Sequence, residues 1–386
     1  METVIIVGNT PDTFCIIHEA TKMGYHPVLL CSRAELGGPA TRVVKNVLII
    51  ETVTDKVLRE TEAVAVLCMN FCGFPTYERL RRIFHMHNIY PSPEGFRHYA
   101  YPQLLTNTLQ DQTQTPTGCA TAPYTVVMGG RDFDEEIVKK LLPGILRINH
   151  PPLSWTDQTR EAVVTNKKSL QRLLDLEKNN HARFLLEQRL AQEEECITMT
   201  VVANGRTVAS YRPMHATMTT DAIGRIHCET TEFSSFEPME KTVVQRMLEI
   251  LIVIIKQTKH IGVLTGDFVK QKNGNILLTA VYPFPVAQGA WTDHGTVVES
   301  QYKGHLLATL LRSLPDTHMC AKKVLLVQFR QIMGEEFNLG EERMIYKSPD
   351  NKNLEIRRSF HATIYGISSI DLVSPVARVI HMEWRD

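Results

Sequence analysis

The sequence predicts a multidomain α/β protein, and three observations lead to that prediction. First, a chain of 386 residues exceeds one ordinary core and fits two or three units of about 100 to 200 residues each. Second, the first hundred residues alternate short apolar runs with amphipathic segments, which is typical of a parallel sheet with crossover helices. Third, Asn-Gly turn signals separate later apolar runs, and these favour antiparallel hairpins.

The N-terminal α/β unit is predicted to cover residues 1–115. A helix is expected at 14–23, and Thr10 to Thr13 predict a solvated loop and helix cap before it. A polar Thr- and Gln-rich stretch, 106–121, has no apolar period and predicts a connector. The apolar runs predict strands at 4–7, 28–31, 47–50 and 64–69.

Three further units follow, at 116–186, 187–315 and 316–386. The first is a small lid, with strands at 124–128 and 145–148 and a helix at 133–142. The second is a core in which Asn204-Gly205 and Asn273-Gly274 mark hairpins and 239–258 is a long helix. The last is a small β-rich unit with strands at 324–328, 359–365 and 377–384.

Net charge and cysteine usage bear on the class of protein. Forty-two basic residues balance forty-two acidic ones, so nucleic-acid binding would need a local patch. The eight cysteines contain no Cys-x-x-Cys pair and predict reduced, buried thiols. The longest apolar stretch, 247–255, contains Glu249 and is far shorter than the ~20 residues that span a bilayer. We therefore expect no membrane span.

Three stretches of the sequence carry a recognisable set of motifs. They are Pro91-Ser92-Pro93-Glu94, then Leu185-Leu186-Glu187-Gln188 followed by Glu195, and a long stretch from Ile261-Gly262-Val263-Leu264 through Pro283, Gly289, Trp291-Thr292 and Ser300-Gln301 to His305-Leu306. With these motifs the chain resembles carboxyaminoimidazole ribonucleotide synthetase, an ATP-grasp ligase of purine synthesis. The resemblance implies an ATP-grasp fold of α/β class, with an N-terminal pre-ATP-grasp domain, a lid and a β-rich C-terminal unit.

The resemblance also implies a nucleotide site. Arg147 stands where the family has a phosphate-binding lysine, and Asp267 stands where it has the first of two metal-binding carboxylates. Glu187 and Glu195 stand where it contacts adenine and ribose. We name these four residues as vestigial nucleotide-binding candidates. On the residues alone, Arg147 as a surface charge and the glutamates as solvated acids stay open.

Other positions depart from the family's chemistry. Ala280 replaces its second metal carboxylate, and Thr279 replaces the amide beside it. Tyr101-Pro102 replaces an Asp-Arg pair, and 151–158 lacks every glycine of the loop that cradles the γ-phosphate. Because one short carboxylate cannot hold a magnesium pair, we predict no catalytic residue, no metal site and no enzyme activity.

This pattern of loss predicts a non-catalytic ATP-grasp subunit of an RNA-processing assembly. The chain resembles the paired guide-RNA-associated proteins of the kinetoplastid mitochondrial RNA editing substrate binding complex. That resemblance implies binding of guide RNA, through its 5′-triphosphate, or of a nucleoside triphosphate, with no certain cofactor. It also implies a homologous second subunit, further assembly subunits and a mitochondrial location, although no transit peptide is visible.

Two alternatives stay open. One is a working ATP-dependent carboxylate–amine ligase of purine-synthetase type, in which Asp267, Asp293 or Glu299 rebuilds the metal site. The other is a scaffold that binds no ligand.

Overall fold

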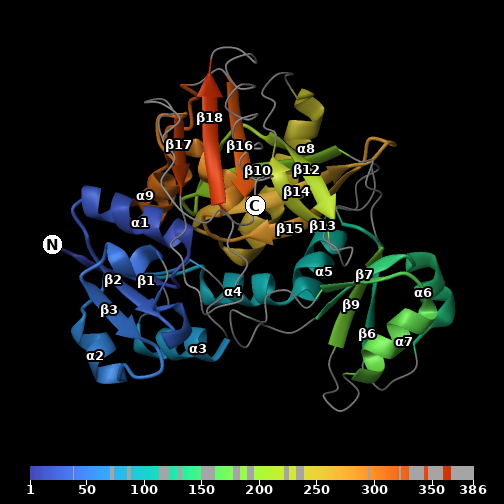
Figure 1. Ribbon diagram of the computed structural model, residues 1–386, viewed down its shortest axis with the longest axis horizontal. Coiled ribbons are helices and arrows are strands. Elements are labelled where there is room, and N and C mark those ends of the chain that lie inside the picture. Colours follow the sequence, from blue (N-terminus) through green and yellow to red (C-terminus); the bar gives the residue numbers. More distant parts are fainter. Residues whose placement is uncertain are drawn as a thin grey trace, which may run out of the picture.

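The structure, a computed structural model, describes most of the chain (Figure 1). The described residues are 1–37, 39–69, 74–84, 88–112, 121–128, 133–148, 161–176, 183–188, 195–220, 226–231, 239–293, 296–320, 323–329, 343–346 and 360–366. Within them, no helix combines the length and the apolar character needed to cross a membrane.

A five-stranded parallel sheet forms the centre of the N-terminal unit. Its order is β3-β2-β1-β4-β5. The strands are β1 (Thr3–Val7), β2 (His26–Cys31), β3 (Asn46–Ile49), β4 (Ala65–Cys68) and β5 (Ile89–Tyr90). These strands confirm the parallel sheet that the alternating apolar runs predict.

Helices cover both faces of this sheet, which explains why its strands are apolar throughout. On the face with Val4 and Ile6 lie α1 (Pro11–Lys22) and α9 (Gln301–Leu311). On the face with Ile5 and Val7 lie α2 (Asp55–Glu60), α3 (Phe74–Ile83) and α4 (Pro93–Ala100). Helix α9 belongs to the predicted core unit, 187–315, and its Tyr302 and Leu306 lie in the same apolar cluster as Val4 and Ile6. The N-terminal unit and the core therefore share one apolar cluster.

Helix α1 begins at the predicted cap. Thr10 Oγ1 accepts from the N–H of Thr13, and Thr13 Oγ1 accepts from the N–H of Thr10, both at 3.2 Å. These reciprocal bonds satisfy donors that a helix start leaves open. Thr13 is fully buried, so the cap is confirmed while the prediction of a solvated loop is wrong at this residue.

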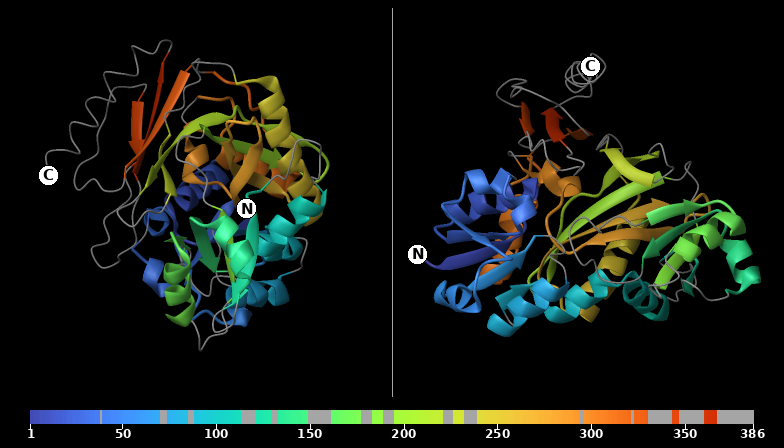
Figure 2. Two further views of the ribbon diagram at one scale, coloured as in Figure 1. Left: turned by 90° about the vertical axis from the view of Figure 1, so that its right-hand side faces the viewer. Right: turned by 60° about the horizontal axis from the view of Figure 1, so that its bottom comes forward.

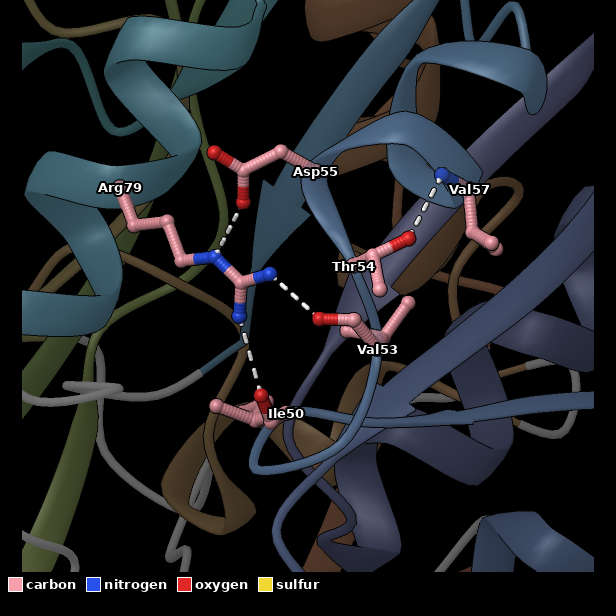
Figure 3. Close-up of polar contacts among 6 residues, drawn as sticks. All are labelled: Ile50, Val53, Thr54, Asp55, Val57 and Arg79. Atoms are coloured by element: carbon pink, nitrogen blue, oxygen red, sulfur yellow. Dashed lines mark hydrogen bonds and ion pairs between the residues drawn. The ribbon is translucent and has the colours of Figure 1, made fainter.

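Arg79 ties α3 to the segment between β3 and α2 (Figure 3). Its Nε donates to Asp55 Oδ1 at 2.7 Å, and its two terminal nitrogens donate to the carbonyl oxygens of Ile50 and Val53. Thr54 Oγ1 caps α2 by accepting from the N–H of Val57. The planar guanidinium thus joins three acceptors at the edge of the N-terminal unit.

A four-stranded antiparallel sheet with two helices forms the lid, which lies at the right of Figure 1. Its order is β6-β9-β7-β8. The strands are β6 (Tyr124–Met128), β7 (Gly144–Ile148), β8 (Glu161–Val164) and β9 (Arg183–Gln188). One face packs on α6 (Glu135–Leu141) and α7 (Lys167–Leu176). The predicted helix at 133–142 is confirmed but shorter, because Asp134 accepts from the N–H groups of Glu136 and Ile137 and caps it.

The core is built on a second, larger sheet. Its order is β15-β14-β10-β12-β13-β16-β18-β17, with β11 beside β10. The strands are β10 (Glu195–Ala203), β11 (Val208–Ser210), β12 (Met214–Thr220), β13 (Ile226–Thr231), β14 (Gly262–Lys270), β15 (Ile276–Tyr282), β16 (Lys323–Phe329), β17 (Arg343–Tyr346) and β18 (Phe360–Gly366). Both predicted hairpins are confirmed, since β10 pairs with β11 and β14 with β15 in antiparallel register.

Helix α8 (Lys241–Thr258) packs on one face of the core sheet. Two further helices connect the N-terminal unit to the lid. Figure 2 shows α4 and α5 (Pro102–Gln112) running along the core from the N-terminal unit toward the lid. The predicted connector 106–121 is therefore wrong up to Gln112: Leu105 and Leu109 pack in the same apolar cluster as α8, which makes this polar stretch helical.

The C-terminal strands extend the core sheet. β16 pairs with β13, and β18 pairs with β16, so the predicted strands at 324–328 and 359–365 are confirmed. The strand predicted at 377–384 and the loop 151–158 lie outside the described residues. The bounds of the four predicted domains stay predictions.

Candidate nucleotide site

Two of the predicted site residues, Arg147 and Glu187, are in direct contact on the lid. Arg147 lies on β7 opposite Leu185 of β9, and Glu187 is two residues further along β9. Side chains two residues apart share a face of a strand. Arg147 Nε and Glu187 Oε2 are 2.9 Å apart, and both side chains are largely buried. The lid therefore presents a joined cation and anion on one face.

This pair faces the core and not the lid helices. The neighbouring positions Leu146 and Leu186 point the other way, into the apolar cluster with α6 and α7. Across the boundary, Arg147 Nη1 donates to the carbonyl oxygen of Thr279 on β15 at 3.3 Å. The guanidinium thus contacts both the lid sheet and the core sheet.

Thr279 occupies an irregular place in β15. Asp267 pairs with Ala280 and Phe268 pairs with Leu278, so Thr279 is an extra residue in the ladder, a β-bulge. Its Oγ1 donates to the main-chain oxygen of Asp267 at 3.1 Å. The bulge therefore links Arg147 of the lid to the strand that carries Asp267.

Asp267 is a buried carboxyl held by hydroxyl groups. Only 6% of the residue is exposed, and Thr198 Oγ1 donates to Oδ1 at 2.7 Å. Burial raises the pKa of Asp267 to about 6, while hydrogen bonds from Thr198 and Tyr282 oppose the rise. Its partner across the ladder is Ala280, which brings no second carboxylate.

The residues present do not fit a protein-held magnesium pair. The fold family implies two carboxylates across the phosphates, and Asp267 is the one carboxylate at this place in β14 and β15. Among the described residues, no three His, Cys, Asp or Glu side chains lie close enough together to hold a metal ion. The described residues of this site therefore provide no carboxylate pair for magnesium.

Asp293 and Glu299, the alternative metal ligands, are engaged elsewhere. Asp293 lies near Cys15 and Tyr302: burial raises the pKa of both groups, and the charge of Asp293 adds to the rise. Glu299 pairs with Lys303 at 2.8 Å and accepts from the N–H of Asp316 at 2.8 Å. These contacts give no support to a metal site rebuilt around Asp267.

Glu195 does not join the other three candidates. It pairs with Lys270 in the register of β10 and β14, whereas Asp267 pairs with Thr198. Positions three residues apart on a strand point to opposite faces. Glu195 Oε1 lies 2.8 Å from Nδ1 of His215, and Oε2 lies 3.4 Å from Nζ of Lys270. The structure therefore places Glu195 on the α8 face of the core sheet.

Sequence reasoning missed the hydroxyl groups around Asp267. Thr198, Thr200 and Thr265 are buried within apolar strands, and Thr200 Oγ1 lies 3.0 Å from Thr265 Oγ1. Threonines that alternate with apolar residues in a buried strand are the signal that could have found them. Tyr282, two residues after Ala280, carries no such signal.

Comparison with known proteins places this geometry in context. No protein-family model matches the chain. The N5-carboxyaminoimidazole ribonucleotide synthase of Staphylococcus haemolyticus is 22% identical over 374 residues, which cover 94% of this chain and 92% of the relative. The synthetase structure from Thermus thermophilus has a TM-score of 0.76 at 18% identity and covers 98% of both chains.

The chain has an ATP-grasp fold. The Staphylococcus aureus synthetase, solved with ADP, has a TM-score of 0.76 at 18% identity and covers 97% of this chain and 96% of its own. The Aspergillus clavatus enzyme, solved with ADP and 5-aminoimidazole ribonucleotide, has a TM-score of 0.73 at 13% identity and covers 99% and 98%. The predicted resemblance to carboxyaminoimidazole ribonucleotide synthetase, an ATP-grasp ligase, is thus confirmed over nearly the whole of this chain.

These comparisons overturn the predicted function. The relatives are synthetases that match from end to end, so the interpretations as a non-enzyme and as a guide-RNA-binding subunit of an RNA-editing assembly are wrong. The relatives solved with nucleotides hold ADP or ATP, which gives an RNA 5′-triphosphate no support. The second subunit, the mitochondrial location and the nucleotide roles of the four site residues stay predictions.

Proposed function

We propose that this chain is an ATP-dependent carboxylate–amine ligase of the purine-synthetase type, which binds an adenine nucleotide between its lid and its core sheet. The observation that supports this most is the reach of Arg147 from the lid to Thr279 on the core. It places a cation at the boundary between the two sheets, beside the strand that carries Asp267. The relationship to synthetases over 94% of the chain points the same way.

Arg147 would bind the phosphates. A guanidinium offers five N–H donors in a planar fork that matches phosphate oxygens. Its ion pair with Glu187 and its contact with the Thr279 carbonyl hold the guanidinium at the boundary between the two sheets. An arriving phosphate would compete with Glu187 and with the Thr279 carbonyl for these donors. The same exchange would release Glu187 toward the base, the role that the resemblance implies for it.

The reaction class fits such a site in outline. In a carboxylate–amine ligase, the γ-phosphoryl group moves from ATP to a carboxylate oxygen, and ADP leaves. The amine nitrogen then attacks the acyl carbon, and phosphate leaves with the carboxylate oxygen. Arg147 would meet the negative charge that accumulates on the phosphoryl oxygens. Asp267, which accepts a hydrogen bond from Thr198 at 2.7 Å, would stay part of the core wall beside the phosphates.

The test is the formation of ADP from ATP and Mg²⁺, with 5-aminoimidazole ribonucleotide as amine and bicarbonate as carboxylate. We expect ADP only when both acceptors are present. Arg147→Ala should lower the rate about tenfold or more, the usual range for a hydrogen bond to a charged group. Arg172→Ala, an exposed arginine on α7, is the matched control and should leave the rate unchanged. ADP formation that ignores Arg147, or none at all, would contradict the proposal.

A further inference from the structure

We propose that this chain binds the phosphates of its nucleotide through Arg147 without a cation held by the protein, so that its affinity for nucleotide is independent of magnesium. The inference rests on the proposed nucleotide site between lid and core. It departs from what the fold family implies, which is a pair of magnesium ions held by carboxylates.

The first argument comes from the oxygen ligands that the core sheet offers to a metal ion. Magnesium requires near-octahedral coordination by oxygen, with one or two carboxylates in addition to the phosphates. Asp267 faces Ala280, whose methyl group offers no oxygen, and Thr279 lies in the bulge with its hydroxyl donating to the Asp267 main chain. The two positions beside Asp267 therefore supply no second carboxylate.

Asp267 itself is committed to protein donors. Thr198 donates to Oδ1 at 2.7 Å, and Tyr282 also hydrogen-bonds this carboxyl. These two bonds use two of the roughly four acceptor positions of the carboxyl and hold it in the wall of the core, where 6% of the residue is exposed. Asp267 alone therefore offers a metal ion at most one buried carboxylate, without the second one that the fold family implies.

Arg147 supplies positive charge for the phosphates, which the fold family would supply through magnesium held by two carboxylates. It is held in place by Glu187 at 2.9 Å and by the Thr279 carbonyl at 3.3 Å, and 21% of its side chain is exposed. Arginine cannot lose its charge at any ordinary pH and can bind a phosphate in two-point fashion. The cation is therefore preformed, and binding needs no metal to complete the site.

The inference concerns the bonds between protein and nucleotide. A nucleotide that carries magnesium in solution remains a ligand of the same site, because Arg147 contacts phosphate oxygens and not the metal. The ligase activity proposed above is therefore compatible with a magnesium requirement of the reaction itself. What the donor set predicts is that magnesium does not anchor the nucleotide to the core sheet.

The test is calorimetric titration of the full chain with ADP, once in EDTA and once in Mg²⁺ at equal ionic strength. We expect the two dissociation constants to agree within about threefold. Arg147→Ala should weaken binding about tenfold or more in both buffers, Arg147→Lys should fall between, and Arg172→Ala should match the natural chain. Circular dichroism of each variant checks that it folds.

Three outcomes overturn the inference in distinguishable ways. Binding that is tenfold or more weaker in EDTA, restored by Mg²⁺, would show a protein-held cation and leave the proposed nucleotide site standing. Failure of ADP to bind in either buffer would remove the proposed site itself, and the inference with it. Binding that Arg147→Ala and Arg147→Lys leave unchanged would also overturn it, since the phosphates would then lie elsewhere.

Discussion

Arg147 and Glu187 form an ion pair of 2.9 Å on the lid, and the same guanidinium donates to the carbonyl of Thr279 on the core sheet. One side chain thus joins two lid strands to the strand that borders Asp267. Because both members are largely buried, this pair has more effect on structure than an exposed one.

Removing the anion should loosen the lid. In Glu187→Ala, Arg147 loses its partner, and we expect faster hydrogen exchange at the amides of β7 and of β15 around Thr279. The matched control is Lys167→Ala, which removes the exposed ion pair between Lys167 and Glu135 on the outer side of the lid. That variant should change exchange little. Equal protection of β7 and β15 in Glu187→Ala and the natural chain would mean that the pair does not hold the lid to the core.

Restoring a second carboxylate should create a magnesium dependence. Ala280→Glu places an acid opposite Asp267, since the two residues pair across β14 and β15. We expect ADP affinity in Mg²⁺ to exceed that in EDTA by about tenfold, the scale of one added charged ligand. Ala280→Gln has the same shape without the charge and should stay insensitive to Mg²⁺. An Ala280→Glu chain that also ignores Mg²⁺ would place the nucleotide away from this strand pair.

Replacing Gly262 by alanine should destabilise the fold more than the same change at Gly274, although both glycines have a positive φ. Its φ is +110°, and an added Cβ would lie 2.7 Å from Nδ1 and Cε1 of His305. Gly274 has a φ of +85° with nothing within 4 Å. Gly274→Ala should therefore lower the free energy of unfolding by about 1–2 kcal/mol from strain alone. Gly262→Ala should lose about 1–3 kcal/mol more from the clash. Urea unfolding measures both, and equal losses would rule out the clash.

Two buried histidines should make the protein sensitive to acid. His260 Nε2 donates to the carbonyl of Val263 at 2.9 Å, and His305 Nδ1 accepts from the Val263 N–H at 3.1 Å. Burial lowers the pKa of His260 to about 4 and that of His305 to about 3. Because the folded pKa values are depressed, the neutral forms stabilise the fold fully above about pH 6.5. That stability is lost as the pH falls toward 4 and then 3.

The measurement is the free energy of unfolding in urea at pH 7.5, 6 and 5. Each unit of depressed pKa contributes about 1.4 kcal/mol once the unfolded histidine is protonated. His305→Gln should reduce the loss of unfolding free energy between pH 7.5 and pH 5. His18→Gln, which changes an exposed residue of α1, should leave that loss unchanged. A slope that His305→Gln leaves unchanged would assign the acid sensitivity to other groups.

Local patterns predicted the elements well. The N-terminal strands, the helix that became α8 and the two Asn-Gly hairpins each depend on residues close together in the chain, and all are confirmed. The connector at 106–121 failed up to Gln112, because the burial of Leu109 against α8 is a tertiary effect. Composition alone carries no information about such packing.

The site was harder to predict because its contacts join distant parts of the chain. The Arg147–Glu187 pair depends on the register of β7 and β9, and the Asp267–Thr198 bond on that of β10 and β14. Neither register can be read from spacing. The prediction of a non-enzyme failed for another reason: it rested on family ligands that are missing at positions such as Ala280 and Tyr101-Pro102, whereas the relationship to synthetases extends over 94% of the chain.

The most direct test of the account is a crystal structure of the chain with ADP. The account predicts the diphosphate between β7 and β15, within hydrogen-bonding distance of the Arg147 guanidinium, with no metal bridging it to Asp267. ADP bound elsewhere, with the Arg147–Glu187 pair and the Thr279 contact intact, would contradict it.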